Sequence, residues 1–136
     1  MGKVLGVDYG TKRTGIAITD EMQIIASGLT TISSDKLDQF IFDLIAKENI
    51  ECFVIGDPKN LDGSSTDSTG HVRGFIKRLK KKYPTIPVHQ IDERFTSKIA
   101  KETILASGVK KKMRANKALV DKVSAAIILQ NYLDYR

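Results

Sequence analysis

The chain has 136 residues, of which 41% are apolar and 28% are charged. That length suits a single domain spanning residues 1–136 and excludes two full domains. No run approaches the ~20 apolar residues of a membrane span, and the first residues lack a signal-peptide pattern, so we expect a cytoplasmic protein without a membrane partner. The single cysteine, Cys52, cannot form an internal disulfide, and its apolar neighbours predict a buried thiol.

Positive charge is concentrated in two stretches of the sequence. The formal net charge is +6, and the runs KRLKKK (77–82) and KKKMRANK (110–117) together hold ten of the 22 lysines and arginines and no acid. Either run alone is typical of a solvated helix face or loop. Two such runs in one small domain favour a nucleic-acid partner.

The first third of the chain predicts three strands, at residues 3–8, 14–19 and 22–31. Their short connections contain Gly10 and the Asp20–Glu21 pair, which predicts an antiparallel meander. The period then changes to three and four over residues 33–50, which predicts a helix. Its N-cap could be Ser33, Ser34 or Asp35. The apolar stripe of this helix is Leu37, Phe40, Ile41, Leu44 and Ile45.

The remaining elements alternate between strands and helices. A buried strand is predicted at 51–57, a polar loop at 60–70, a helix at 71–83, a strand at 86–92 and a helix at 96–108. After the second basic run, residues 117–136 predict a long final helix. The order predicts an α/β fold with a mixed five-stranded sheet, whose fourth and fifth strands join through helical crossovers. The apolar run Phe53–Gly56 predicts a strand that is covered on both faces.

Carboxylates stand at the ends of two predicted strands. Asp8 ends the first strand and shares one face with Val4 and Gly6, and Gly6 leaves space for something to approach. The alternative is that Asp8 only starts the following turn. In IDERFT, Asp92 and Glu93 end a strand and precede a helix, so they could serve a site at the strand ends or simply complement the helix dipole.

Asp121 lies in the final helix, where most other positions are apolar. An unpaired carboxylate in such a buried helix is costly. Either a lysine or arginine pairs with Asp121, or a cation is shared between Asp121 and further acids. The small residues Ser124 and Ala125 would let this helix lie close to the sheet.

Clustered carboxylates suit hard divalent cations. Mg²⁺ prefers oxygen ligands and is held by one or two carboxylates together with substrate phosphates, and two such ions can stabilise the attacking and leaving oxygens at a phosphodiester. On this hypothesis Asp8 faces a metal ion, an arrangement that the spacing permits.

Four segments together resemble the YqgF/RuvX family of Holliday junction resolvases and pre-16S rRNA nucleases: DYGTKRTGIAITD, VIGDPKNLDGSS, IDERFTS and VDKVSAAIILQNYLD. The resemblance implies a ribonuclease H-like fold with a five-stranded mixed sheet flanked by helices. It also implies Asp8, Glu93 and Asp121 as metal ligands and catalytic residues, Mg²⁺ or Mn²⁺ as cofactor, and hydrolysis of structured nucleic acid in the bacterial cytoplasm. Asp57 departs from the family pattern, which more often has an apolar residue there, and its role stays open.

Several residues are candidates to bind the substrate. Lys12 and Arg13 adjoin Asp8, and Arg94 follows Glu93, so each could hold a phosphate or could be a plain solvated or paired charge. The polar and basic loops could clamp the strands through Gly63, Ser64, Ser65, Lys110, Lys111, Lys112 and Arg114. Of the two histidines, we expect His89 to pack and leave His71 unassigned.

Two substrates fit this reading, a precursor of 16S rRNA and a DNA junction. Junction cleavage normally needs two symmetric active sites, and the sequence shows no dimer seam. We therefore favour processing of the 5′ end of pre-16S rRNA by a monomer or weak dimer, with ribosomal particles as a further candidate partner. The alternatives are a Holliday junction resolvase, a non-catalytic RNA- or ribosome-associated protein, and a nucleotide phosphotransferase, for which one domain lacks half of the cleft.

Overall fold

A computed structural model describes residues 2–57, 69–92, 100, 102–103 and 117–136. The described elements are β1 (Lys3–Asp8), β2 (Arg13–Thr19), β3 (Ala26–Ser33), the 3₁₀ helix η1 (Ser34–Lys36), α1 (Leu37–Lys47), β4 (Ile50–Asp57), α2 (Thr69–Lys82), β5 (Val88–Asp92) and α5 (Lys117–Tyr135). The polar loop, the second basic run and most of the helix predicted at 96–108 lie outside the described residues.

The five strands form one mixed sheet in the order β3-β2-β1-β4-β5. β2 pairs antiparallel with both β1 and β3, whereas β4 pairs parallel with both β1 and β5. The predicted α/β architecture, with an antiparallel meander followed by helical crossovers, is confirmed. Because β1, β4 and β5 are parallel, their carboxyl ends lie at the same edge of the sheet.

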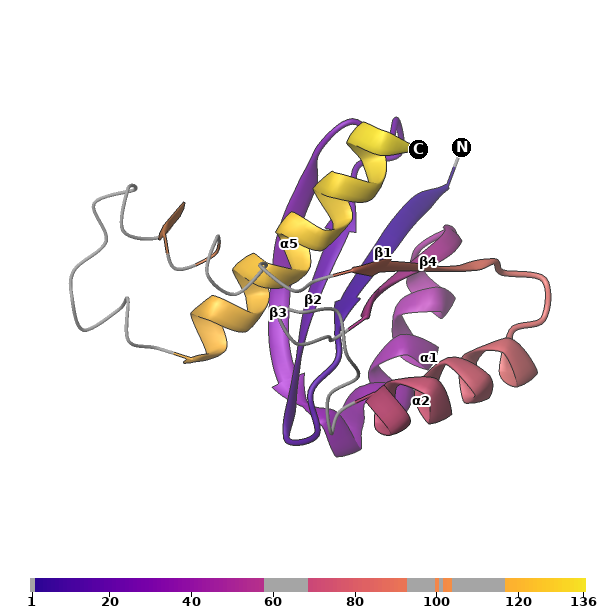
Figure 1. The fold of residues 1–136 in the computed structure, drawn as a ribbon. Helices are drawn as coiled ribbons and strands as arrows, with labels where there is room; N and C mark the ends of the chain where they lie inside the picture. Colours follow the sequence, from indigo (N-terminus) through magenta and orange to yellow (C-terminus); the bar gives the residue numbers. More distant parts are fainter. Residues whose placement is uncertain (1, 58–68, 93–99, 101, 104–116) are drawn as a thin grey trace.

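Helices cover both faces of this sheet (Figure 1). On one face, Leu5, Val7 and Ile55 pack in a cluster that includes α1 and α2. On the other face, Val4 and Val54 pack against α5. Side chains that alternate along β1 and β4 therefore contribute to two hydrophobic cores, one on each face of the sheet. The strand that contains Phe53–Gly56 is covered on both faces, as predicted.

The third strand begins later than predicted, at Ala26 instead of residue 22. The Asp20 carboxylate accepts hydrogen bonds from the backbone N–H groups of Met22, Ile24 and Ile25, at 3.0, 3.0 and 2.9 Å. These bonds, led by the one from Ile25, hold the pKa of Asp20 below its ordinary value. They fold residues 20–25 into a turn. Residues 22–25, which the apolar pattern had predicted to be part of the strand, therefore belong to this turn.

Neither serine proposed as the cap of the first helix caps it. Ser33 precedes η1 and makes no side-chain capping bond, and α1 itself follows Lys36. The Ser34 hydroxyl instead donates to the carbonyl of Gly10 at 2.5 Å. The 3₁₀ turn rotates this hydroxyl toward the β1–β2 turn, which needs an internal partner for its backbone oxygen.

Glycines on three neighbouring strands allow α5 to lie directly on the sheet. A Cβ at Gly6 would stand 2.8 Å from the Leu129 Cβ, and a Cβ at Gly28 would stand 2.7 Å from the Lys122 Cγ. A Cβ at Gly15 would overlap the backbone oxygen of Asp121. The space beside Asp8 that Gly6 was expected to leave for an approaching group is therefore filled by α5.

Only one side of α5 is buried, although its composition predicted burial nearly all round. Its buried residues are Ser124, Ala125, Ile128 and Leu129. Ser124 and Ala125 face the sheet with exposures of 1% and 0%, as their small size predicted. The opposite side of α5 is only partly buried. Among the described elements, the sheet packs against one side of this helix. No described helix is long and apolar enough to cross a membrane.

The glycine seam makes a stability prediction with an internal control. We expect Gly15→Ala to destabilise the protein by about 1–3 kcal/mol. The added methyl group would overlap the backbone of α5, which cannot move aside as a flexible side chain could. Gly74→Ala in α2 should instead stabilise by about 1 kcal/mol, since its Cβ would meet only the Arg78 Nη1, at 3.9 Å. Urea denaturation of both variants tests this, and equal effects of the two substitutions would contradict it.

Candidate nuclease active site

Asp8 occupies the carboxyl end of β1 on the face that α5 covers. Its register partner on β2 is Gly15. Residues directly opposite each other in an antiparallel pair project to the same face. Gly15 lies against the Asp121 backbone in α5, so the backbones of Asp8 and Asp121 both adjoin this one glycine. The fold thereby brings together two acids that are far apart in the chain.

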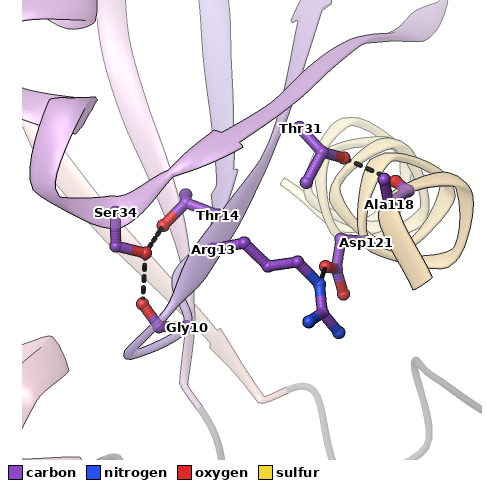
Figure 2. Close-up of polar contacts among 7 residues, drawn as sticks. All are labelled: Gly10, Arg13, Thr14, Thr31, Ser34, Ala118 and Asp121. Atoms are coloured by element: carbon purple, nitrogen blue, oxygen red, sulfur yellow. Dashed lines mark hydrogen bonds and ion pairs between the residues drawn. The ribbon is translucent and has the colours of Figure 1, made fainter.

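Asp121 makes an ion pair with Arg13, the first residue of β2. The Arg13 Nε donates to the Asp121 Oδ2, and the two side chains are 41% and 21% exposed. Figure 2 shows the guanidinium reaching across from the strand to the helix, with its two terminal nitrogens directed away from the carboxylate. The pairing of Asp121 with an arginine, one of the two alternatives for this acid, is therefore present in the structure.

The ion pair does not compensate fully for the burial of Asp121. Burial raises the pKa of this carboxyl group above its ordinary value, although the hydrogen bond and charge of Arg13 and the charge of Lys117 act in the opposite direction. The charged form of Asp121 therefore lies in a site that would favour additional positive charge. A divalent cation beside Asp121 would supply it.

The hydroxyl groups of Ser34 and Thr14 make contacts near the β1–β2 turn that sequence reasoning did not identify. The Ser34 Oγ lies 2.7 Å from the Thr14 Oγ1, and the Ser34 N–H donates to the Lys12 carbonyl at 3.0 Å. Together with the bond to Gly10, these contacts tie the β1–β2 turn to η1 (Figure 2).

On the other side of the site, Thr31 connects β3 to α5. Its hydroxyl donates to the Ala118 carbonyl in the first turn of α5. Thr31 is also the register partner of Gly15. The sequence signal that could have revealed this arrangement is glycine inside strands, which marks a close approach of another backbone.

All three parallel strands end in aspartate. β1 ends at Asp8, β4 at Asp57 and β5 at Asp92, and Asp57 and Asp92 are register partners. In open sheets with parallel strands, ligands bind beyond the carboxyl ends of the strands. Each of the three parallel strands therefore has an aspartate as its last residue, at the edge of the sheet where a metal or substrate site is expected.

The other predicted site residues are distributed unevenly. Lys12 is exposed in the turn beside Arg13. The described residues contain no group of three metal-ligating side chains. The predicted residues that lie outside the described part of the chain are Glu93, Arg94, Gly63, Ser64, Ser65, Lys110, Lys111, Lys112 and Arg114. His89 is exposed and stacks on Tyr132 with ring centroids 5.1 Å apart, a contact in keeping with the packing role that was predicted for it.

Solved structures with the same fold are Holliday junction resolvases. The complex of Thermus thermophilus RuvC with a Holliday junction substrate aligns with a TM-score of 0.59 and 14% identity, over 98% of this chain and 94% of that chain. The yeast mitochondrial resolvase Ydc2 aligns with a TM-score of 0.59 and 12% identity, over 96% and 77% of the two chains. The sheet and its helices therefore have the ribonuclease H-like fold, as the sequence resemblance implied.

Sequence comparison assigns the family. The model described as "RuvX: Holliday junction resolvase" matches residues 2–135. A relative from Flavobacterium psychrophilum, named "Putative pre-16S rRNA nuclease", is 53% identical over 98% of this chain and 97% of its own length. A relative of the same name from Bacteroides thetaiotaomicron is 48% identical over 98% and 97%. The chain belongs to the RuvX family.

The Arg13–Asp121 contact predicts a measurable coupling in the absence of metal. In a double-mutant cycle with Arg13→Gln and Asp121→Asn, we expect a coupling of about 1 kcal/mol in EDTA, reduced in high salt because both side chains are partly exposed. Urea denaturation of the four proteins at two salt concentrations measures it. A coupling near zero at low salt would mean that the pair contributes nothing to folding.

Proposed function

We propose that this protein is a divalent-metal-dependent nuclease that hydrolyses phosphodiester bonds at the 5′ end of pre-16S rRNA. The observation that supports it most strongly is the convergence of Asp8 and Asp121 on Gly15, at the carboxyl end of β1. The names of the full-length relatives favour the ribosomal RNA precursor as substrate. Such an enzyme would act in the bacterial cytoplasm, as one domain of residues 1–136, on RNA alone or in ribosomal particles.

The donor chemistry of the site fits Mg²⁺ or Mn²⁺. Carboxylate oxygens are the ligands that these ions prefer, and burial leaves the charge of Asp121 only partly compensated. We propose that Asp8 and Asp121 hold the metal and that Glu93, the residue after β5, is the third ligand. When bound, such ions neutralise charge on the phosphoryl oxygens and lower the pKa of water.

Arg13 has a defined part in this scheme. Without metal it is the cation beside Asp121, and a divalent ion at the same carboxylate would compete with it. Arg13 would then turn toward the substrate phosphate, which its guanidinium can bind through two parallel hydrogen bonds. Lys12 and Arg94 are proposed as further phosphate ligands.

The loops are proposed to hold the remainder of the substrate. Residues Gly63, Ser64 and Ser65 could donate hydrogen bonds to phosphates, and the basic run could attract the strand electrostatically through Lys110, Lys111, Lys112 and Arg114. The protein is proposed to act as a monomer or weak dimer.

A Holliday junction is the second candidate substrate. The description of the family and the junction-bound RuvC neighbour favour it. It would require two copies of the site held by a two-fold axis. A non-catalytic role on RNA or ribosomes is the third possibility, in which the acids would not be needed for function in the cell.

Metal removal tests the site without reference to cleavage. Mn²⁺ should stabilise the wild-type protein by about 2.7 kcal/mol at one hundred times its dissociation constant, because it binds only the folded state. Asp8→Asn and Asp121→Asn should lose most of this gain, whereas Asp43→Asn, an exposed acid on α1, should retain it. Thermal melts with Mn²⁺ and with EDTA measure the difference. Equal Mn²⁺ stabilisation of all four proteins would remove the proposed metal site.

Substrate choice is tested by matched cleavage assays with Mn²⁺. We expect the wild-type protein to cleave an RNA that carries the 5′ precursor segment of 16S rRNA faster than a four-way DNA junction. Asp8→Asn should fold normally and lower the cleavage rate by at least about a hundredfold, since it removes a ligand that positions the reaction. Preference for the junction would favour the second candidate. If Asp8→Asn restored rRNA processing fully in a deletion strain, catalysis would not be the function needed in the cell.

A further inference from the structure

Helix α2 carries more positive charge than the fold needs. Six of its 14 residues are lysine or arginine and none is acidic. All six cationic side chains are exposed, whereas Val72, Phe75, Ile76 and Leu79 are buried on the opposite side of the helix. The proposed active site uses none of these cations.

Two of the six cations are held by the neighbouring helix α1. The Arg78 Nε lies 3.3 Å from the Asp38 Oδ2. The Lys82 Nζ lies over the Phe42 ring, 5.0 Å from its centroid. The other four form what we call the α2 cation row: Arg73, Lys77, Lys80 and Lys81. Among the described residues, none of these four has an ion-pair or ring partner.

Helix stability explains only two of the four residues of the α2 cation row. Arg73, Lys77 and Lys81 follow one another at four-residue spacing, about 6 Å along the helix axis. Like charges at this spacing destabilise a helix by about 0.2–0.5 kcal/mol per pair. The helix dipole favours cations in the last turn, which accounts for Lys80 and Lys81 and leaves Arg73 and Lys77 without a structural reason.

Among the described residues, little stands against the helix surface next to the row. Within that part of the chain, a Cβ at Gly70 would meet nothing within 4 Å, and one at Gly74 would meet only the Arg78 Nη1, at 3.9 Å. An extended polyanion could therefore approach the helix closely along Arg73 and Lys77.

The row lies on the opposite side of the sheet from the acids. α2 packs in the same core as α1, whereas Asp121 belongs to α5 on the other face (Figure 1). The stacking of Tyr9 on Phe75, with centroids 5.0 Å apart, places the middle of α2 near the end of β1. A short straight duplex bound at Asp8 and Asp121 would not also lie along α2. A substrate with a second arm or a flanking segment would contact the two acids and α2 at the same time.

We propose that the α2 cation row binds the sugar-phosphate backbone of a second segment of the nucleic acid that is cleaved at the acids. The proposal rests on the proposed function only for the identity of the ligand as a nucleic acid. Lysine and arginine contact phosphates without reading sequence, so this surface selects substrates by shape. It favours branched or flanked nucleic acids over short duplexes.

Binding in EDTA, in an Asp8→Asn background that cannot cleave, tests this surface. The probes are a fluorescent RNA hairpin with a single-stranded flank, the same hairpin without the flank, and both made as DNA. The test variant is Lys77→Gln/Lys81→Gln. The matched control is Lys36→Gln/Lys47→Gln on the neighbouring α1 side, which lowers the net charge by the same two units. Circular dichroism melts confirm that both variants fold.

We expect the test variant to bind the flanked hairpin at least about tenfold more weakly, with the slope of log K against log salt reduced by about two. The hairpin without the flank and the control variant should change less than about twofold. Equal losses in the two double variants, an unchanged slope, or no binding by the background protein would each overturn the proposal. Loss with RNA only, or with RNA and DNA alike, supports the surface and identifies which backbone it accepts.

Cleavage by the wild-type protein with Mn²⁺ separates this inference from the proposed function. Cleavage together with an unchanged salt slope would overturn the α2 surface and leave the nuclease intact. Binding that depends on α2, without any cleavage, would overturn the nuclease chemistry and leave the surface intact.

Discussion

The close contact between α5 and the sheet is the constraint on which the site depends. Gly6, Gly15 and Gly28 lie on three adjacent strands, and a side chain at any of them would collide with α5. At Gly15 the helix backbone itself fills the position that a methyl group would take. Because Asp8 is the register partner of Gly15, this contact fixes an acid of the sheet beside an acid of the helix. Gly15 therefore determines both how closely α5 packs on the sheet and which two acidic residues lie next to each other.

The electrostatics of the site follow from that packing. Drawing Asp121 toward the sheet removes water from its carboxylate and raises its pKa, and Arg13 offsets only part of the cost. Another cation can replace a partly exposed arginine at a low cost in free energy, because water solvates the guanidinium group when the ion pair breaks. The arrangement is consistent with a site at which Asp121 binds a cation that is not a side chain of the protein.

The two faces of the sheet have different electrostatic character. The face covered by α5 carries Asp8 and Asp121, and the face covered by α2 carries a helix with six cations and no acid. The stacking of Tyr9 on Phe75 joins the end of β1 to α2. A nuclease built in this way would contact a long substrate on both sides of one sheet edge.

The sequence alone determined the element types, the mixed sheet, the family and the strand-end position of Asp8, because periodicity and motif spacing are local properties. It misplaced the start of β3, since the hydrogen bonds of Asp20 override apolar patterning there. It also offered Ser34 as one of three candidate helix caps, whereas the Ser34 hydroxyl binds the β1–β2 turn. Only the tertiary structure showed that Arg13 is the residue that pairs with Asp121. That pairing depends on which strand residue lies across from the helix, a contact between residues 108 positions apart that no local pattern encodes.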